Sequence, residues 1–286
     1  MWQTVFSSQH LNRFGLAVFL ALTLLPLVAG LSYALAYSLG LAGALTSGFT
    51  LTYWALVLCA SETWYSLALS VGIAATVVVV STILAMSVVL AWGDRLDNGM
   101  PGYLMYLPLA IPPLTAAFLT FQWLGKSGLL ARTGVLAGLI SDLEYAPELI
   151  NDPWHVGILV TLTALTAPFF SILFLQYRRA ENLPQLMLVA QTLGASAMQT
   201  VWRVAVPVLL RRALPNLGLS GIFLFGAYEA PLLLGRQSPR MISVLIAQKF
   251  RKFNISDVPQ AYVLTLLYAG AVGLAAWWIF RKMKQK

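Results

Sequence analysis

The chain has 286 residues, of which 59% are hydrophobic and only 10% are charged, and its mean hydropathy is +0.78. A soluble domain carries about a quarter charged residues, so this composition excludes a globular domain solvated by water and predicts a chain surrounded by lipid. The net charge of +8 comes from basic residues between apolar runs rather than along one face. This pattern argues against a nucleic-acid partner and is typical of topology signals and contacts with lipid headgroups.

The first apolar run begins at Phe14 and continues past Leu35. It is longer than the apolar core of a signal peptide, so we expect a retained helix. A spanning helix needs about 20 mainly apolar residues, and six stretches meet this length: Phe14–Ser38, Leu67–Trp92, Gly102–Leu124, Val156–Tyr177, Leu217–Leu234 and Ala261–Phe280. We therefore predict an all-α integral membrane protein with six transmembrane helices, forming a single domain over residues 1–286.

A shorter apolar segment follows the first predicted span, at Phe49–Ala60, and is rich in threonine and aromatic residues. We predict an interfacial helix on the outer face, with a seventh span as the alternative. Three further segments, 125–154, 178–213 and 235–259, are too polar for spans and too long for turns. Connections of this length usually have a function of their own.

The third and fifth predicted spans contain residues that break helices. Pro112 and Pro113 interrupt the third, and Gly226 and Pro231 loosen the fifth. Transporters place broken helices around their pathways, because free backbone groups are tolerated only where they face protein or water. Simple kinks are the alternative interpretation.

The segment 178–213 contains the pattern of two short helices joined at a glycine. Pro184 suits a first helical turn, Gly194 is placed to adopt the left-handed conformation that ends a helix, and Ser196 with Gln199 has the spacing of a capping box. Pro207 is expected to end the second helix. We call residues 181–207 the elbow.

Apolar residues recur on both helices of the elbow at helical spacing: Leu186, Val189, Ala190 and Leu193 on the first, and Met198, Val201, Trp202 and Ala205 on the second. With Arg203 beside it, this stripe has the form of a surface that docks into a groove on a partner. Packing against the chain's own helices is the alternative, and these residues alone do not decide between the two.

Glu229 is the acidic residue well inside a predicted span, and a charge there predicts a functional role. With Tyr228, Pro112 and Pro113 we assign it to a substrate pathway, where it would attract a cationic cargo. In the alternative, Glu229 reaches the headgroups or pairs with Arg236.

The stretch 188–207 resembles the EAA loop of binding-protein-dependent ABC importer permeases. Ala190, Gly194 and Pro207 match that motif in identity and spacing, and Val204 and Val206 replace its Ile and Leu. The start differs, because Leu188 and Val189 stand where the family has Glu and Ala. The resemblance implies that this loop docks into the nucleotide-binding subunit; the residues we assign to that contact are Ala190, Gly194, Ala195, Ser196, Trp202, Arg203, Val204 and Pro207.

Further segments are similar to the spermidine/putrescine-type permeases: 107–113 with 128–130, and 226–235 with 241–246 and 248–250. The resemblance implies a type I importer permease that forms half a pathway. Its implied partners are ABC ATPase subunits, an extracytoplasmic solute-binding protein and a second permease subunit, which we expect to differ from this chain, with a homodimer as the alternative. A polyamine is the nearest cargo, with thiamine, iron and other small solutes behind it.

The distribution of Lys and Arg predicts that both termini lie in the cytoplasm of a bacterium, with the chain crossing its inner membrane several times. This orientation places eleven of the eighteen basic residues inside: Arg13, Arg95, Arg178, Arg179, Arg203, Arg211, Arg212, Arg281, Lys282, Lys284 and Lys286.

Two other classes of protein were weighed. Gly218-Leu-Ser220-Gly221 fits the surroundings of a rhomboid protease nucleophile, but neither His10 nor His155 lies in a span after Ser220 to act as its base. A secondary transporter or channel would need no elbow. The chain lacks a phosphate-binding Gly-x-x-x-x-Gly-Lys-Ser/Thr motif and is predicted to be non-catalytic, with ATP hydrolysis in a partner. Cys59 is alone, and we expect no cofactor or metal.

Overall fold

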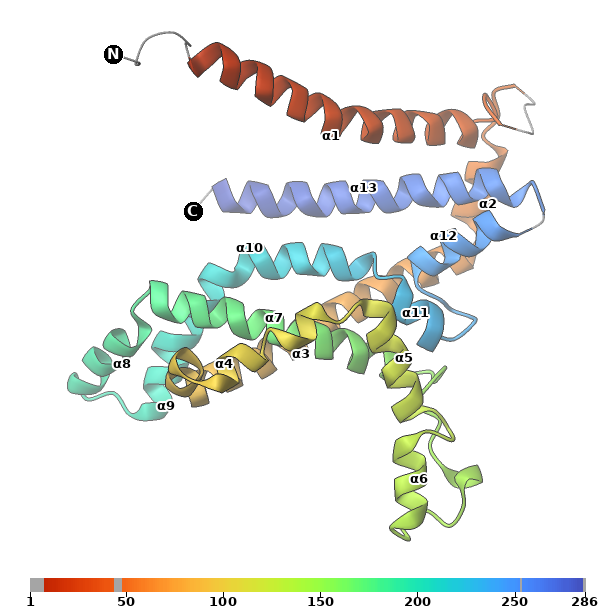
Figure 1. Cartoon of the computed structure of the whole chain (residues 1–286). Helices are drawn as coiled ribbons and strands as arrows, with labels where there is room; N and C mark the ends of the chain where they lie inside the picture. Colours follow the sequence, from red (N-terminus) through yellow and green to blue (C-terminus); the bar gives the residue numbers. More distant parts are fainter. Residues whose placement is uncertain (1–7, 44–47, 253, 285–286) are drawn as a thin grey trace, which may run out of the picture. The chain divides into compact units, whose positions relative to one another are not determined.

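The computed structural model describes residues 8–43, 48–252 and 254–284, and their regular structure is helical throughout (Figure 1). The predicted all-α class is therefore confirmed. The chain forms two compact units. The first comprises Met1–Thr63 and Ile246–Ala271, and the second comprises Trp64–Leu245 and Val272–Lys286.

The first unit contains α1 (Ser8–Ser38), α2 (Thr52–Cys59), most of α12 (Ile242–Arg251) and the first part of α13 (Asp257–Lys284). An aromatic cluster joins them: the ring centroid of Tyr262 on α13 lies 5.9 Å from that of Tyr33 and 4.6 Å from that of Tyr37, both on α1. The indole Nε1 of Trp54 donates a hydrogen bond to Ser38 Oγ at 3.1 Å, which ties α2 to the end of α1.

The short helix α2 settles one of the alternatives for residues 49–60. Its eight residues extend for about 12 Å, well short of the hydrocarbon thickness of a bilayer. The seventh-span interpretation is therefore wrong, and the interfacial placement stays a prediction.

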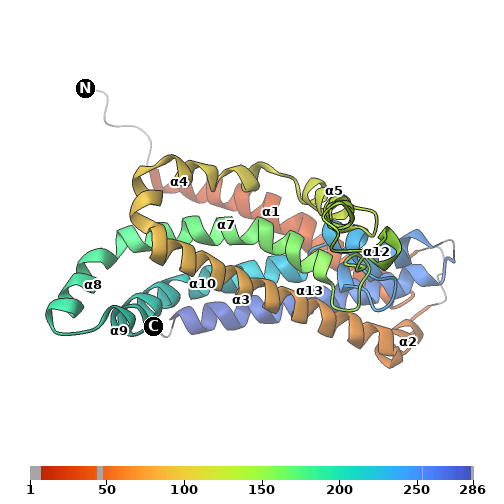
Figure 2. The same cartoon turned by 90° about the horizontal axis from the view of Figure 1, so that it is seen from below.

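The second unit is organised around α7 (Val156–Ala180), which packs against α5 (Pro113–Leu124), α10 (Val206–Phe225), α11 (Glu229–Leu234) and α8 (Leu183–Thr192). The unit also holds α3 (Ser61–Asn98, entering from the first unit), α4 (Met100–Leu104), the 3₁₀ turn η1 (Leu107–Ala110), α6 (Leu129–Leu136) and η2 (Leu143–Tyr145), and then α9 (Ala197–Thr200) and the π-helical turn η3 (Val201–Ala205). Figure 1 shows α8 and α9 at one end of α7, and α5 and α11 at the other. Figure 2 shows the same separation of α8 from α5.

The core of the second unit lies where α3, α7 and α10 meet, at the end that carries α8. Its largest fully buried side chains are Phe170 and Phe174 of α7, with Leu183 of α8 and Leu209 of α10. Burying such a side chain contributes about 1.5–3 kcal/mol, so this core fixes the base of α8 to the spanning helices.

Within the described residues, five helices are long and apolar enough to cross a membrane, and a bent pair makes a sixth candidate. The first, second, fourth and sixth predicted spans are confirmed as α1, α3, α7 and α13. The third prediction, Gly102–Leu124, is not one straight helix. It consists of Met100–Ala110 and Pro113–Leu136, bent by 97° at the break. Ile111 and Pro112 are extended there, with ψ of 120° and 143°, because a residue before proline is driven away from the helical region.

The bounds predicted for the fifth span were wrong. The helical segment long enough to cross runs over Ala197–Phe225 rather than Leu217–Leu234. It ends because the N–H groups of Gly226 and Ala227 turn back to the carbonyls of Phe223 and Leu224, three residues earlier. The short helix α11 begins after this turn as a separate element.

Candidate functional site

The elbow adopts the local structure that its residues predict. Pro184 lies in the first turn of α8, and Gly194 has φ of +92°. The N–H of Ala195 donates to the carbonyl of Ala190 at 3.0 Å, and the N–H of Gly194 donates to that of Gln191 at 2.9 Å. These two bonds form a Schellman motif, which satisfies the last carbonyls of α8 and sets the direction of the chain beyond it.

The capping box after the glycine is also confirmed. The backbone N–H of Gln199 donates to Ser196 Oγ at 3.3 Å, and the backbone N–H of Ser196 donates to Gln199 Oε1 at 3.0 Å. Because both ends of the turn are closed by hydrogen bonds of their own, the turn between α8 and α9 has a defined shape rather than that of a flexible loop.

Pro207 does not end the second helix, contrary to the prediction. The helix continues from α9 through the π-helical turn at Val201–Ala205 into α10, where Pro207 occupies the first turn. A π-helical turn shifts the hydrogen-bond register by one residue, and a proline in the turn that follows removes no N–H that the helix needs. The elbow is therefore continuous with α10.

The two faces of the elbow differ in burial. Leu183, Thr200 and Ala205 are fully buried against the core of the second unit. On the opposite face the large apolar side chains are exposed; these are Leu186, Leu188, Val189, Leu193, Met198 and Trp202. We call this set the crest. The hypothesis that the stripe packs against the chain's own helices holds for Ala205 and is wrong for the crest.

The crest has exposed residues on both sides of the glycine turn. Leu193, at the tip, is 83% exposed, and Trp202 is 63% exposed. The Trp202 indole donates a hydrogen bond to Met198 Sδ at 3.1 Å, which holds the two side chains together. The remaining residues assigned to the coupling contact surround this surface: Ser196 and Arg203 are exposed, and Ala190, Ala195, Val204 and Pro207 are half-buried.

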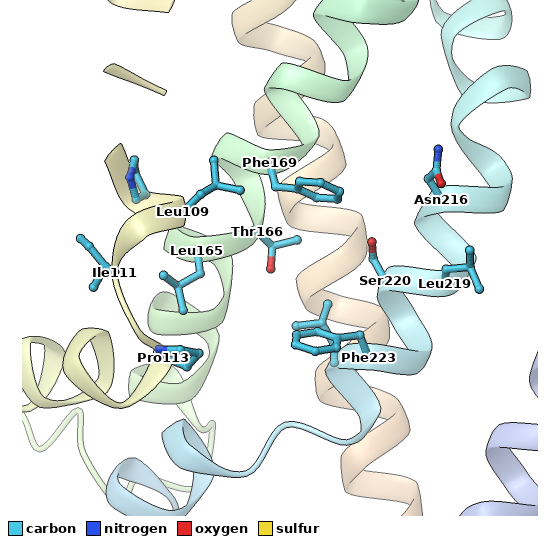
Figure 3. Close-up of a pocket in the computed structure, with 12 residues that line it drawn as sticks. Leu109, Ile111, Pro113, Leu165, Thr166, Phe169, Asn216, Leu219, Ser220 and Phe223 are labelled. Carbon is cyan, nitrogen blue, oxygen red and sulfur yellow. The ribbon is translucent and has the colours of Figure 1, made fainter. Parts of the chain in front are cut away.

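A cavity of about 520 Å³ lies between the broken third span, α7 and α10 (Figure 3). Phe169 of α7 and Phe223 of α10 reach toward the space between their helices. Most of the lining is apolar, and its polar side chains are Thr166, Asn216 and Ser220. The residues that line the cavity include no charged group and no histidine; they are Pro108, Leu109, Ile111, Pro113, Leu165, Thr166, Phe169, Asn216, Leu219, Ser220, Phe223 and Leu224.

The polar groups of the cavity are held differently. The amide Nδ2 of Asn216 donates to the hydroxyl of Tyr177 at 2.6 Å, which fixes its orientation. Within the described part of the chain, the hydroxyls of Thr166 and Ser220 make no hydrogen bond to protein. They are therefore available to a polar solute.

The four residues assigned to the substrate pathway are not brought together. Pro113 lines the cavity, and Pro112 caps the N-terminus of α5 and shapes the bend. Tyr228 and Glu229 lie at the start of α11, outside both the cavity lining and the helix long enough to span.

Glu229 is exposed. No ion pair of Glu229 with Arg236 or with any other described residue is present, so the predicted pairing is wrong. The phenol of Tyr228 is buried without a hydrogen-bond partner among these residues.

Sequence reasoning missed Thr166 and Asn216 and did not assign Ser220 to a substrate pathway. The available signal was the spacing of Asn216 and Ser220, which are four residues apart and therefore share one face of an apolar helix. Among the described residues, no group of three or more His, Cys, Asp or Glu side chains is arranged to hold a metal ion.

Comparisons with known proteins agree with this geometry. Residues 102–285 match the model of a family described as binding-protein-dependent transport system inner membrane component. The chain is similar to the molybdenum transport system permease protein ModB of Mycobacterium bovis and that of Mycobacterium tuberculosis. Identity to each is 25% over 217 residues, covering 75% of this chain and 77% of the relative.

A solved structure shares the fold. It is the crystal structure of a bacterial ABC transporter involved in the import of the acidic polysaccharide alginate, with a TM-score of 0.71 and 14% identity, covering 97% of this chain and 95% of that one. The family model spans well over half of the chain, and the protease and secondary-transporter hypotheses are therefore wrong. The chain belongs to the binding-protein-dependent transport system inner membrane component family, as a non-catalytic, multi-pass inner-membrane permease subunit of a type I ABC importer.

Proposed function

We propose that residues 1–286 act as one permease domain and that the loop 178–213 is its coupling loop, in which the elbow docks into the ATPase subunit by its crest. The observation that supports this proposal is the contrast between the two faces of the elbow. The crest is exposed, whereas Leu183, Thr200 and Ala205 are fully buried. Large apolar side chains that are exposed on both sides of a tight turn favour a partner surface, because exposed patches of this kind mark interaction sites.

The crest has the composition of a binding surface. Trp202 and Met198 provide a large aromatic and polarisable contact, and residues of this kind dominate the energy of protein interfaces. The neighbouring charge of Arg203 suits the polar rim that surrounds such a contact.

The buried face of the elbow supports the transmission of movement from the crest to the spanning helices. Leu183 and Ala205 are both fully buried in the core that contains Phe174 of α7. A close-packed core of low compressibility passes a displacement of the crest to the helices below it instead of absorbing it.

The coupling proposal is tested by substitution in the crest. The chain is purified from membranes with Trp202→Asp or, as a matched control, Leu136→Asp, which places the same charge on an exposed leucine of α6 at the opposite end of α7. We expect the first variant to lose the co-purifying ATPase subunit and the second to retain it. Equal recovery of the ATPase subunit in both would contradict docking by the crest.

We further propose that both termini and the elbow face the cytoplasm, and that the cavity faces a second permease subunit. The cavity is lined by one wall of helices from this chain, which suits half of a pathway that another subunit completes. Leu188 and Val189 replace the Glu and Ala of the loop motif, which favours a partner that is not a copy of this chain. Mass spectrometry of the purified transporter distinguishes the two cases by the presence or absence of a second permease sequence.

The proposed cargo is a small anion rather than a polyamine. The described residues that line the cavity include no carboxylate to attract a cation, and its hydroxyl and amide groups can donate hydrogen bonds to an oxyanion. The similarity to molybdenum permeases agrees with this choice, whereas the sequence resemblance to polyamine permeases favours the opposite one.

The charge of the cargo is tested at Ser220 by Ser220→Asp and its near-isosteric neutral counterpart Ser220→Asn. For an anionic cargo, the acidic variant transports far less than the neutral one, because a like charge in a site of low dielectric repels the solute. Faster uptake by the acidic variant would instead establish a cationic cargo.

A further inference from the structure

An ionic cluster lies directly below the elbow, between the last turns of α3 and α7. Arg178 pairs with Asp97 at 2.7 Å through Nη1 and with Asp94 at 2.5 Å through Nη2. Arg179 pairs with the second carboxylate oxygen of Asp97 at 2.6 Å and also donates to its backbone carbonyl at 3.2 Å. We call Asp97, Arg178 and Arg179 the ionic bracket, and Asp94 is an exposed outer partner of Arg178.

The bracket and its outer partner Asp94 differ in exposure. The side chains of Arg178 and Asp97 are only 12% and 15% exposed, whereas that of Asp94 is 89% exposed. An exposed pair adds little stability, while removing one partner of a buried pair leaves a charge without compensation. Asp97 is therefore the centre of the bracket, since it accepts hydrogen bonds from both arginines.

Gly93 makes room for the bracket on α3. A Cβ atom at this position would lie 2.7 Å from Arg178 Nε and 2.8 Å from its Cζ. The arginine therefore crosses α3 directly over the glycine, and a methyl group there would displace the guanidinium from both aspartates. Gly72, on the same helix, has no atom within 4 Å of a Cβ built on it.

A second ion pair lies on the other side of the same end of α7. Glu181, at the start of the elbow, pairs with Arg212 of α10. Together the two sets of charges connect the end of α7 to α3 on one side and to α10 on the other. Both connections lie within a few residues of Leu183, where α8 begins.

We infer that the ionic bracket is a positioning device, which keeps the end of α3 in step with the elbow when the ATPase subunits close. This inference rests on the proposed docking of the elbow. Apolar packing transmits a displacement but is not directional, whereas fixed, directional ion pairs at the ends of α3 and α7 specify one register. Without the bracket, the elbow and α10 would move while α3 stayed behind, and ATP would be hydrolysed without passage of the solute.

The inference is tested in proteoliposomes that contain the complete transporter with its binding protein, by the number of ATP molecules hydrolysed per solute imported. We compare Asp97→Asn with Asp94→Asn, an identical change at the exposed partner. We expect Asp97→Asn to raise this ratio about tenfold, equivalent to about 1.4 kcal/mol of lost coupling, and Asp94→Asn to leave it near the wild-type value. Asp97→Glu, which keeps the charge, should recover most of the loss.

A second pair of variants tests the bracket without removing a charge. Gly93→Ala should raise the ratio in the same direction as Asp97→Asn, and Gly72→Ala should not. An unchanged ratio in both Asp97→Asn and Gly93→Ala, with the transporter assembled, would overturn the inference. The same result would follow for a bracket that serves folding alone, because a folding defect lowers the amount of transporter and leaves the ratio unaltered.

Recovery of the ATPase subunit with each variant separates this inference from the function on which it rests. If the wild-type chain does not retain the ATPase subunit, the proposed docking fails. If every variant retains it and the ratio does not change, docking stands and the role of the bracket is wrong.

Discussion

The elbow and the broken third span are irregular segments that contact α7 at different places, and they use irregular backbone in opposite ways. The elbow closes its turn with a Schellman motif and a capping box, and leaves large apolar side chains exposed. The broken span ends its helix at consecutive prolines, which have no N–H to satisfy, and leaves space beside Pro113. One segment provides a surface for a protein and the other provides room for a solute. Different substitutions therefore test the two segments.

The largest effect is expected from removing the prolines of the third span. In a helix interior alanine is favoured over proline by about 3 kcal/mol per residue, so Pro112→Ala with Pro113→Ala favours a continuous helix through the 97° bend. We expect uptake to be nearly abolished and the cavity to narrow. The labelling rate of a cysteine at position 220, in a Cys59→Ser background, measures that narrowing.

A proline outside the break provides the control for this experiment. Pro26 lies inside the continuous helix α1, so Pro26→Ala should change neither uptake nor labelling. Rapid labelling of the double variant at position 220 would show that tertiary packing, and not the prolines, maintains the bend.

The next effect is expected at the glycine of the elbow. A non-glycine residue with φ near +92° is strained by about 1–3 kcal/mol, and the β-branched valine of Gly194→Val is a poor fit for this conformation. We expect ATP hydrolysis to be uncoupled from transport while insertion into the membrane stays normal. Both activities are measured on the same proteoliposomes.

A matched glycine lies at the other end of the unit. Gly138 also has positive φ, +69°, and neither glycine has an atom within 4 Å of a built Cβ. Gly138→Val therefore introduces similar strain far from the crest and should leave coupling intact. Normal uptake by Gly194→Val would contradict a role of the elbow in coupling.

A smaller effect is expected at the tip of the crest. Leu193→Ala removes apolar area that only a partner can bury, since the side chain is 83% exposed in the isolated chain. We expect the affinity for the ATPase subunit to fall by a factor of about 5–10, equivalent to about 1 kcal/mol, with no loss of stability of the free chain. Titration of the purified ATPase subunit against the variant in nanodiscs gives the affinity. An unaltered affinity would indicate that Leu193 lies outside the contact with the ATPase subunit.

The smallest effect is expected from the cap. Ser196→Ala removes the hydrogen bond that Ser196 Oγ accepts from the N–H of Gln199, which is worth about 0.5–2 kcal/mol locally. Hydrogen exchange at Gln199 should accelerate by about tenfold, while amides of α7 keep their protection. Thr192→Ala, two residues before the glycine, provides a control on the same surface. If Thr192→Ala accelerates hydrogen exchange at Gln199 as much as Ser196→Ala does, the effect is general fraying of the elbow and not loss of the cap.

The structure of the elbow was predictable because its signals are local. Pro184, Gly194 and the Ser196–Gln199 pair act through backbone groups within a few residues, and each occupies the predicted position. Burial of the stripe was not predictable, because spacing shows that residues share a face but not what that face meets.

The end of the second helix and the bounds of the fifth span were both missed. Pro207 was taken as a helix end, but the π-helical turn before it leaves no hydrogen bond for the proline to break. The fifth span was predicted from an apolar stretch with few charges at Leu217–Leu234, which placed Glu229 inside the membrane. A register shift of one residue has no signature in composition or periodicity.

The cavity and the ionic bracket depend on contacts between residues far apart in the sequence. Thr166 and Ser220 meet at one cavity from different helices, and Asp97 lies 81 residues before Arg178. The sequence shows that such residues are polar, but it does not show which of them contact one another in the folded chain. The α-helical class, by contrast, follows from composition alone, because lipid permits no unpaired backbone group.

The uninterrupted passage from the elbow into α10 makes this part of the molecule a lever. Helical backbone runs without a loop from Ala197 to Phe225, whereas on its other side the elbow joins α7 through Asn182, a residue with φ of +47°. The helical arm carries Ser220 about 25 Å from the π-helical turn, so a tilt of about 10° at the elbow moves that hydroxyl through about 4 Å. A displacement of this size exceeds the length of a hydrogen bond, so one stroke of the lever suffices to release a solute held at the wall of the cavity.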